Sequence, residues 1–273
     1  MTEPKLPLIL DTRTLEAHLH DPDLLLVDLS SEESYHTQHI PGAVHLPFPR
    51  LIRQAPPAMG LLPDMETLSA VLSDIGLTED KHVVAYDADG SGKASRLLWT
   101  LDVLGHEHYS LLDGGLHAWT NEGHPVDVAR TDPRPSRYRA EIRNPHALAD
   151  KAYVLKHLND PHVVVLDARS AAEYSGEDKR AERAGHIPGA VNLDWIETMD
   201  THNLKRLKAD ETLRERYKAL GLTPDKEVVV HCQTHHRSAH SFMVLKHLGF
   251  ERVRGYAGSW SEWGNDPDVP VES

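Results

Sequence analysis

Short apolar runs separated by amphipathic stretches recur along the chain. They lie at 24–27, 83–86 and 109–112 in the first half, and at 163–166, 228–231 and 251–254 in the second. Runs of this length are typical of strands buried on both faces, and the stretches between them have the apolar spacing of helices. The alternation predicts an α/β fold in which a parallel sheet is covered by helices on both faces.

The chain also contains an internal repeat. HIPGAVHL at 39–46 returns as HIPGAVNL at 186–193, and GLTEDKHVVAYD at 76–87 returns as GLTPDKEVVVHC at 221–232. Because these motifs recur in the same order, we interpret the chain as a duplication of one domain. We expect domains at 1–130 and 146–273, joined by a proline-rich connector at 131–145.

The second copy of the repeat ends in Cys232, the only cysteine among 273 residues. A buried cysteine is ordinarily a small hydrophobe. Here it follows the valines of 228–230 and opens a turn into a helix, where free backbone amides favour ligand binding, so a functional cysteine is the better hypothesis. The first copy has Asp87 at this place, and a carboxylate cannot perform thiol chemistry. The first domain is therefore expected to be a catalytically silent copy.

Composition narrows the range of partners and compartments. A formal net charge of −13 argues against nucleic acid or an anionic membrane as the main partner, since both require clustered Lys and Arg. The opening MTEPKLPLIL has too short an apolar run for a signal peptide, and no later segment approaches a membrane span. A single cysteine excludes an internal disulfide and fits a cytoplasmic, reducing location.

The loop CQTHHRS at 232–238 contains soft and borderline metal ligands, so zinc or copper must be considered. Adjacent histidines in a tight loop, His235 and His236, rarely point the same way, and no second cysteine exists. We therefore expect no metal. Backbone amides curling around Cys232, the positive end of the following helix and the charge of Arg237 favour a thiolate instead. A pKa two units below about 8.5 corresponds to about 2.7 kcal/mol of anion stabilisation.

These motifs, together with YAGSWSEWG at 256–264, resemble the tandem-domain rhodaneses over nearly the whole chain. The resemblance implies a thiosulfate sulfurtransferase with no cofactor, acting as a monomer, in which Cys232 carries sulfane sulfur as a persulfide. The acceptor is cyanide, another thiophile or a protein. The residues expected to cradle the substrate are Gln233, Thr234, His235, His236, Arg237 and Ser238.

Residues outside the loop receive weaker assignments. Asp167 and Arg169, which follow a predicted strand, are expected to brace the active loop by hydrogen bonds. Trp195 is a candidate for lining the cleft, although aromatic residues after a strand usually pack. Trp260 and Trp263 are expected to pack in the core.

Several alternative functions remain open at this point. Related phosphoester hydrolases place five residues between Cys and Arg, whereas four separate Cys232 from Arg237, so a phosphatase or arsenate reductase ranks last. The mercaptopyruvate-using branch of the family has an arginine where this chain has Glu173, whose charge would repel the donor carboxylate. Thiosulfate is therefore the expected donor. Transfer from 3-mercaptopyruvate and a persulfide-carrying delivery module are the alternatives.

Overall fold

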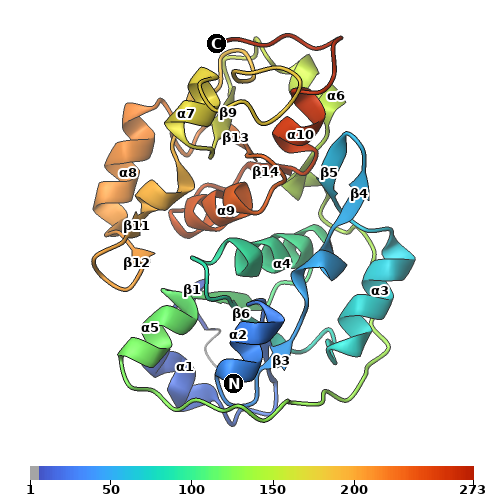
Figure 1. Cartoon of the computed structure of the whole chain (residues 1–273), viewed down its shortest axis with the longest axis vertical. Helices are drawn as coiled ribbons and strands as arrows, with labels where there is room; N and C mark the ends of the chain where they lie inside the picture. The colour runs from blue at the N-terminus through green and yellow to red at the C-terminus, as the bar shows by residue number, and fades with distance from the viewer. Residues whose placement is uncertain (1–5) are drawn as a thin grey trace. The chain divides into compact units, whose positions relative to one another are not determined.

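The computed structural model describes residues 6–273 and divides them into two units (Figure 1). The first unit holds the residues up to Leu51, with Pro63–Arg143 and Asp200–Leu207. The second holds Ile52–Leu62, Asn144–Met199 and Lys208–Ser273. Each unit has its own five-stranded sheet.

The sheet of the first unit has the order β1-β7-β6-β2-β3, and all of its strand pairs are parallel. Its strands are β1 (Ile9–Leu10), β2 (Leu24–Asp28), β3 (Val44–His45), β6 (His82–Tyr86) and β7 (Tyr109–Leu112). Its helices are α1 (Thr12–His18), α2 (Glu32–Thr37), α3 (Met65–Asp74), α4 (Gly92–Val103) and α5 (Gly115–Asn121). A short 3-10 helix, η1, spans Phe48–Leu51.

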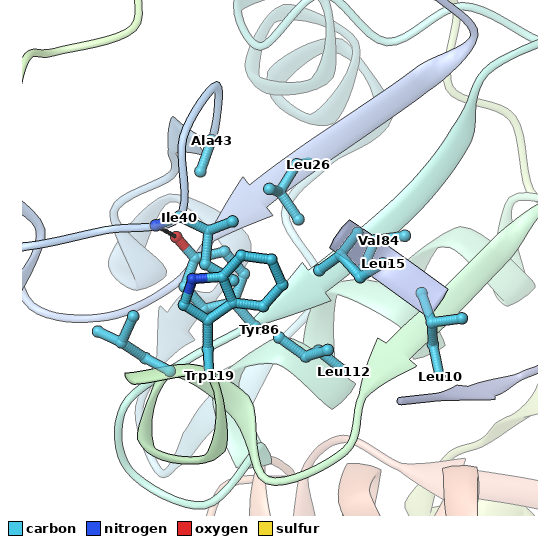
Figure 2. Close-up of a cluster of buried hydrophobic side chains, with 10 residues drawn as sticks. Leu10, Leu15, Leu26, Ile40, Ala43, Val84, Tyr86, Leu112 and Trp119 are labelled. Atoms are coloured by element: carbon cyan, nitrogen blue, oxygen red, sulfur yellow. Dashed lines mark hydrogen bonds between the residues drawn. The ribbon is translucent and has the colours of Figure 1, made fainter. Parts of the chain in front are cut away.

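One face of this sheet forms the buried cluster drawn in Figure 2. Leu26 and Val84 project from the strands toward Leu15 of α1 and Trp119 of α5, and all four are 5% exposed or less. Each such side chain contributes about 1.5–3 kcal/mol by leaving water. The opposite face is covered by α4, which contacts β6 and β7. Helices therefore cover both faces of this sheet.

The sheet of the second unit has the order β10-β9-β13-β14-β8 and is also parallel. Its strands are β8 (Leu148–Ala149), β9 (Val163–Asp167), β10 (Val191–Asn192), β13 (Glu227–His231) and β14 (Val253–Tyr256). Its helices are α6 (Lys151–Lys156), α7 (Ala171–Ser175), α8 (Asp210–Ala219), α9 (Arg237–His247) and α10 (Ser259–Trp263), with 3-10 helices η2 (Pro145–Ala147) and η3 (Trp195–Thr198). The two sheets confirm the predicted α/β class with parallel sheets and flanking helices.

The core of the second unit contains both tryptophans of the segment YAGSWSEWG at 256–264. Trp260 and Trp263 are fully buried with Val165, Val229 and Tyr256. The expected packing role of these tryptophans is therefore confirmed.

Helix starts follow directly from the sequence. In five helices an Asp or Ser immediately before the first turn accepts a backbone N–H three residues later, which satisfies an amide that has no partner inside the helix. The capping residues are Asp11, Ser31, Asp64, Asp150 and Ser170.

The two units do not coincide with the two halves of the sequence, because two short segments group with the opposite half. β4 (Arg53–Ala55) and β5 (Ala58–Leu61) form an antiparallel hairpin that groups with the second unit, although it precedes residue 130. β11 (Met199–Asp200) pairs with β12 (Arg206–Leu207), and 200–207 groups with the first unit. There the Leu207 amide donates to Asp113 Oδ1 at 2.8 Å. The division of the chain at 130 and 146 does not anticipate these exchanges.

Five of the six predicted strands agree with the structure to within a residue at each end. The exception is β14, predicted at 251–254 but found at Val253–Tyr256. Glu251 and Arg252 are exposed, whereas Gly255 and Tyr256 pair with β8. Pairing with β8 thus extends β14 to Tyr256, beyond its predicted end.

The predicted connector at 131–145 is extended over most of its length and follows α3. The amides of Tyr138 and Ala140 donate to the hydroxyls of Ser73 and Ser69, at 3.0 and 2.9 Å. Within 6–273, no helix is both long enough and apolar enough to cross a membrane.

Candidate active site around Cys232

Cys232 lies between the end of β13 and the start of α9, and it has no exposed surface. The start of α10 fixes the loop at its first two residues. The Cys232 carbonyl accepts the Trp260 amide at 2.9 Å, and the Gln233 carbonyl accepts the Ser261 amide at 3.0 Å. The Cys232 amide donates to Ser259 Oγ at 3.3 Å. The segment YAGSWSEWG at 256–264 therefore fixes the first residues of the cysteine loop.

His235 turns the loop back toward Cys232. Its φ is 57°, in the left-handed region that only a few per cent of non-glycine residues adopt. The buried ring is fixed by a 2.7 Å hydrogen bond between Nδ1 and Ser238 Oγ. This turn allows the amides of Thr234 and Ser238 to bond to the Cys232 sulfur. The predicted curling of backbone donors around the thiol is present in the structure.

Electrostatics in the loop favour the thiolate. Burial alone would raise the pKa of Cys232. The charge of Arg237 and hydrogen bonds from Ser238 and the Thr234 amide outweigh burial, so the pKa lies below the ordinary value of a thiol. The amino terminus of α9 adds a partial positive charge to the same place. A lower thiol pKa raises the fraction of the nucleophilic thiolate at a given pH.

Arg237 is held by Glu173. Its guanidinium donates from Nη1 to Oε2 at 2.7 Å and from Nη2 to Oε1 at 2.9 Å, a two-pronged pairing that fixes its plane. Burial raises the pKa of Glu173, but the Arg237 hydrogen bonds and charge bring it down to about 2. Glu173 is itself fixed by a capping box with Ser170 at the start of α7. Glu173 is therefore not the bare repelling charge expected from the sequence, because Arg237 is paired with it.

Asp167, the last residue of β9, and Arg169 form a fully buried ion pair. Arg169 Nε donates to Asp167 at 3.0 Å, and Nη2 donates at 2.5 Å. The guanidinium also lies 4.4 Å from the ring centroid of Trp260. Because Trp260 donates its amide to the Cys232 carbonyl, the pair is linked to the loop through one residue.

His231 ends β13 next to this pair, with Nε2 3.6 Å from Asp167 Oδ2. Burial lowers the pKa of His231 and outweighs the attraction of Asp167. His231 is therefore neutral at physiological pH.

The remaining loop side chains are half-buried. Thr234 Oγ1 and His236 Nδ1 are hydrogen-bonded at 3.2 Å, and Gln233 Nε2 donates to the Arg180 carbonyl at 3.1 Å. The loop thus brings the predicted set together, but His235 and Ser238 are turned toward each other within it.

Trp195 is half-buried at the start of η3. Its amide donates to the Ala168 carbonyl at 3.2 Å, and its ring meets that of His240 edge-on, 5.7 Å between centroids. Burial lowers the pKa of His240 to about 4, so this histidine is neutral. Trp195 therefore has defined packing contacts on one side.

Two further charged residues near the loop were not predicted from the sequence. Arg180, between α7 and β10, interacts electrostatically with both Glu173 and Arg237. Asp194, just before Trp195, interacts with the same pair, and burial raises its pKa. The sequence signal that could have identified them is their place beside the second HIPGA segment, at 186–190.

In the first unit a carboxylate occupies the corresponding loop. Asp87 accepts four backbone N–H groups: Oδ1 takes those of Asp89 and Ser91, both at 2.8 Å, and Oδ2 takes those of Lys93 and Ala94, both at 2.9 Å. The side chain is 1% exposed. Asp87 is therefore an internal anion that fills its own cradle.

The two cradles share two donor positions. Donor amides come two and six residues after the anion in both, from Asp89 and Lys93 around Asp87, and from Thr234 and Ser238 around Cys232. Both copies of the repeat thus contain a loop whose amides point at one side chain, which is Asp87 in the first copy and Cys232 in the second.

Asp87→Ala should lower the free energy of unfolding by about 2–3 kcal/mol, because four backbone amides, two of them on the buried residues Ser91 and Ala94, lose a charged acceptor. Urea denaturation monitored by circular dichroism measures the effect. Asp89→Ala is the matched control, since it removes only the exposed ion pair with Lys93 and should cost less than about 1 kcal/mol. Equal losses in the two variants would refute the structural role of the Asp87 cradle.

Comparison with known proteins places these features in a family. The model of the rhodanese-like domain matches twice, at residues 11–122 and 150–266. The chain belongs to the rhodanese family. Rhodanese-family relatives named thiosulfate sulfurtransferase occur in Azotobacter vinelandii, 43% identical over 98% of this chain and 97% of theirs, and in Pseudomonas aeruginosa, 44% identical with the same coverage.

The rhodanese fold is also seen in a solved structure. SseA from Escherichia coli, which is described as a 3-mercaptopyruvate sulfotransferase, is 28% identical to this chain and superposes with a TM-score of 0.83. The alignment covers 93% of this chain and 99% of that one. The family predicted from the repeat and the cysteine loop is thereby confirmed.

Proposed function

We propose that this chain is a thiosulfate sulfurtransferase whose sulfur carrier is Cys232. The thiolate attacks the outer sulfur of thiosulfate, the sulfur–sulfur bond breaks, and its electron pair leaves with sulfite. Cyanide or another thiophile then attacks the terminal sulfur of the persulfide and regenerates the thiolate. The carrying observation is a buried cysteine whose pKa is lowered by a cation and by loop hydrogen bonds.

The same loop suits both anionic forms of the carrier. Donors that stabilise the thiolate also stand near a persulfide, whose negative charge lies one sulfur further out. The substrate-cradle role of Gln233, Thr234, His235, His236, Arg237 and Ser238 rests on this placement. The bracing role of Asp167 and Arg169 rests on the contact between Arg169 and Trp260.

Repulsion between Glu173 and the donor carboxylate does not account for a preference for thiosulfate. Glu173 is paired with Arg237, so its charge is largely cancelled and gives little repulsion against mercaptopyruvate. The preference rests instead on the two relatives named thiosulfate sulfurtransferase. Transfer from 3-mercaptopyruvate stays the alternative because the fold is shared with the Escherichia coli protein.

The test compares the specificity constants for thiosulfate and 3-mercaptopyruvate with cyanide as the common acceptor. We expect thiosulfate to exceed mercaptopyruvate at least about tenfold, which corresponds to about 1.4 kcal/mol in the transition state. A reversed ratio would move the chain to the mercaptopyruvate branch. Persulfide formation without turnover on either donor would favour a delivery module, and hydrolysis of p-nitrophenyl phosphate a phosphatase.

Other features stay predictions. Four of them follow from the family and the composition. They are a persulfide on Cys232 with no other cofactor, cyanide as an acceptor, a monomeric state and a cytoplasmic location. A protein acceptor is a further proposal, to be separated from cyanide by whether a purified partner protein gains sulfur from the loaded chain.

A further inference from the structure

The β4–β5 hairpin packs against the parts of the second unit that hold the cysteine loop. β5 contacts α10 (Figure 1), and the Met59 amide donates to Ser261 Oγ at 3.1 Å. Gly60 is buried directly against Thr234. A Cβ built on Gly60 would stand 2.7 Å from the Thr234 carbonyl carbon and 2.9 Å from its Cα. Only a residue without a side chain fits there.

This contact is one step from the reacting atom. Thr234, whose backbone touches Gly60, directs its amide at the Cys232 sulfur. Ser261, which accepts the Met59 amide, also donates its own amide to the Gln233 carbonyl. The hairpin therefore reaches the cysteine loop at two points, through backbone packing at Thr234 and through Ser261.

The geometry points to Gly60 as a positioning residue for sulfur transfer, and this inference rests on the proposed function. By allowing β5 to lie against the loop, Gly60 holds the Thr234 amide at the thiolate and so helps to keep the thiol pKa low. A side chain at Gly60 meets the Thr234 backbone and no flexible side-chain end, so either β5 or the Thr234 segment must shift. A misplacement of this kind near a reacting atom is costly even without loss of the fold.

Gly60→Ala tests the inference directly. Because Cys232 is the only cysteine, the ultraviolet absorbance of its thiolate can be titrated against pH, with Cys232→Ser as the baseline. We expect the midpoint to rise by about one pH unit, since a donor to the anion is lost. We also expect kcat/KM for thiosulfate to fall at least about tenfold, mainly through kcat.

Gln54→Ala is the matched control, because it changes an exposed position of the same hairpin. It should leave midpoint and turnover unchanged. Ser261→Ala is the second variant, and it tests the role of the hairpin if Gly60→Ala does not fold. It removes the hydroxyl that accepts the Met59 amide but keeps the amide that donates to Gln233, and its midpoint should shift in the same direction by a smaller amount.

Folded Gly60→Ala with the wild-type midpoint would overturn the inference, as would an unshifted Ser261→Ala where Gly60→Ala fails to fold. The titration uses no sulfur donor and is thus independent of the proposed function. A shifted midpoint in a protein without thiosulfate turnover would keep the positioning role and refute the function.

Discussion

We expect Cys232→Ser to abolish sulfur transfer and to leave the fold intact. A serine hydroxyl is not ionised at neutral pH and cannot carry a transferable sulfur, so turnover with thiosulfate and cyanide should fall by at least about 10³-fold. The circular dichroism spectrum and the unfolding midpoint should stay near those of the wild type, because the two side chains are close in size. Steady-state thiocyanate formation measures the loss.

Intact mass spectrometry supplies the direct readout for this variant. Wild-type protein incubated with thiosulfate should gain the mass of one sulfur and lose it with cyanide, whereas Cys232→Ser should gain none. The wild-type kinetics should be ping-pong, as a covalent carrier requires. An active serine variant, or intersecting double-reciprocal plots, would contradict transfer through Cys232.

Local features of the site were predictable because the sequence signals are local. The valines of 228–230 predict a buried strand, and a strand followed by a cysteine, a short loop and an apolar helix pattern places Cys232 at the strand's carboxyl end. Duplication then identified Asp87 as its counterpart. The same logic located the strands that carry Asp28 and Asp167 to within one residue.

Features that depend on distant partners were not predictable. Glu173 and Arg237 are 64 residues apart, and no local pattern shows that their charges cancel. Gly60 lies in a hairpin that groups with the other half of the chain, so its contact with Thr234 has no signature in either repeat. The four amides around Asp87 belong to the backbone, whose direction residue identity does not reveal.

The loop of the first unit holds a carboxylate where the second unit has a thiol, and its amides still have an acceptor. A cradle of converging amides is unfavourable when empty, because buried N–H groups need acceptors. Asp87 supplies a permanent acceptor, and its carboxylate is bonded to the backbone on both oxygens. Cys232 is the acceptor in the second unit, where the amides of Thr234 and Ser238 bond to its sulfur. The two loops therefore differ in the acceptor that their amides hold, a carboxylate in one and a thiol in the other.

Arg237→Ala should impair catalysis through the thiol and not only through donor binding. The substitution removes the cation that lowers the Cys232 pKa and leaves the Glu173 carboxylate without its partner in a site where it is 7% exposed. Both changes disfavour the thiolate, so the acid limb of the pH dependence of kcat/KM should move to higher pH by about one unit or more. At neutral pH we expect a loss of about 10²-fold, which corresponds to about 2.7 kcal/mol.

The ion pair provides the control for that prediction. In Arg237→Ala with Glu173→Gln the unpaired negative charge is gone, so this double variant should recover part of the lost activity and part of the shift in pH dependence. Glu173→Gln alone keeps the cation, and its acid limb should stay at or below that of the wild type. If Arg237→Ala raises only the Michaelis constant for thiosulfate and the acid limb does not move, Arg237 serves the donor alone. The low thiol pKa must then come from the backbone cradle, because the amides of Thr234 and Ser238 remain in place when the guanidinium is removed.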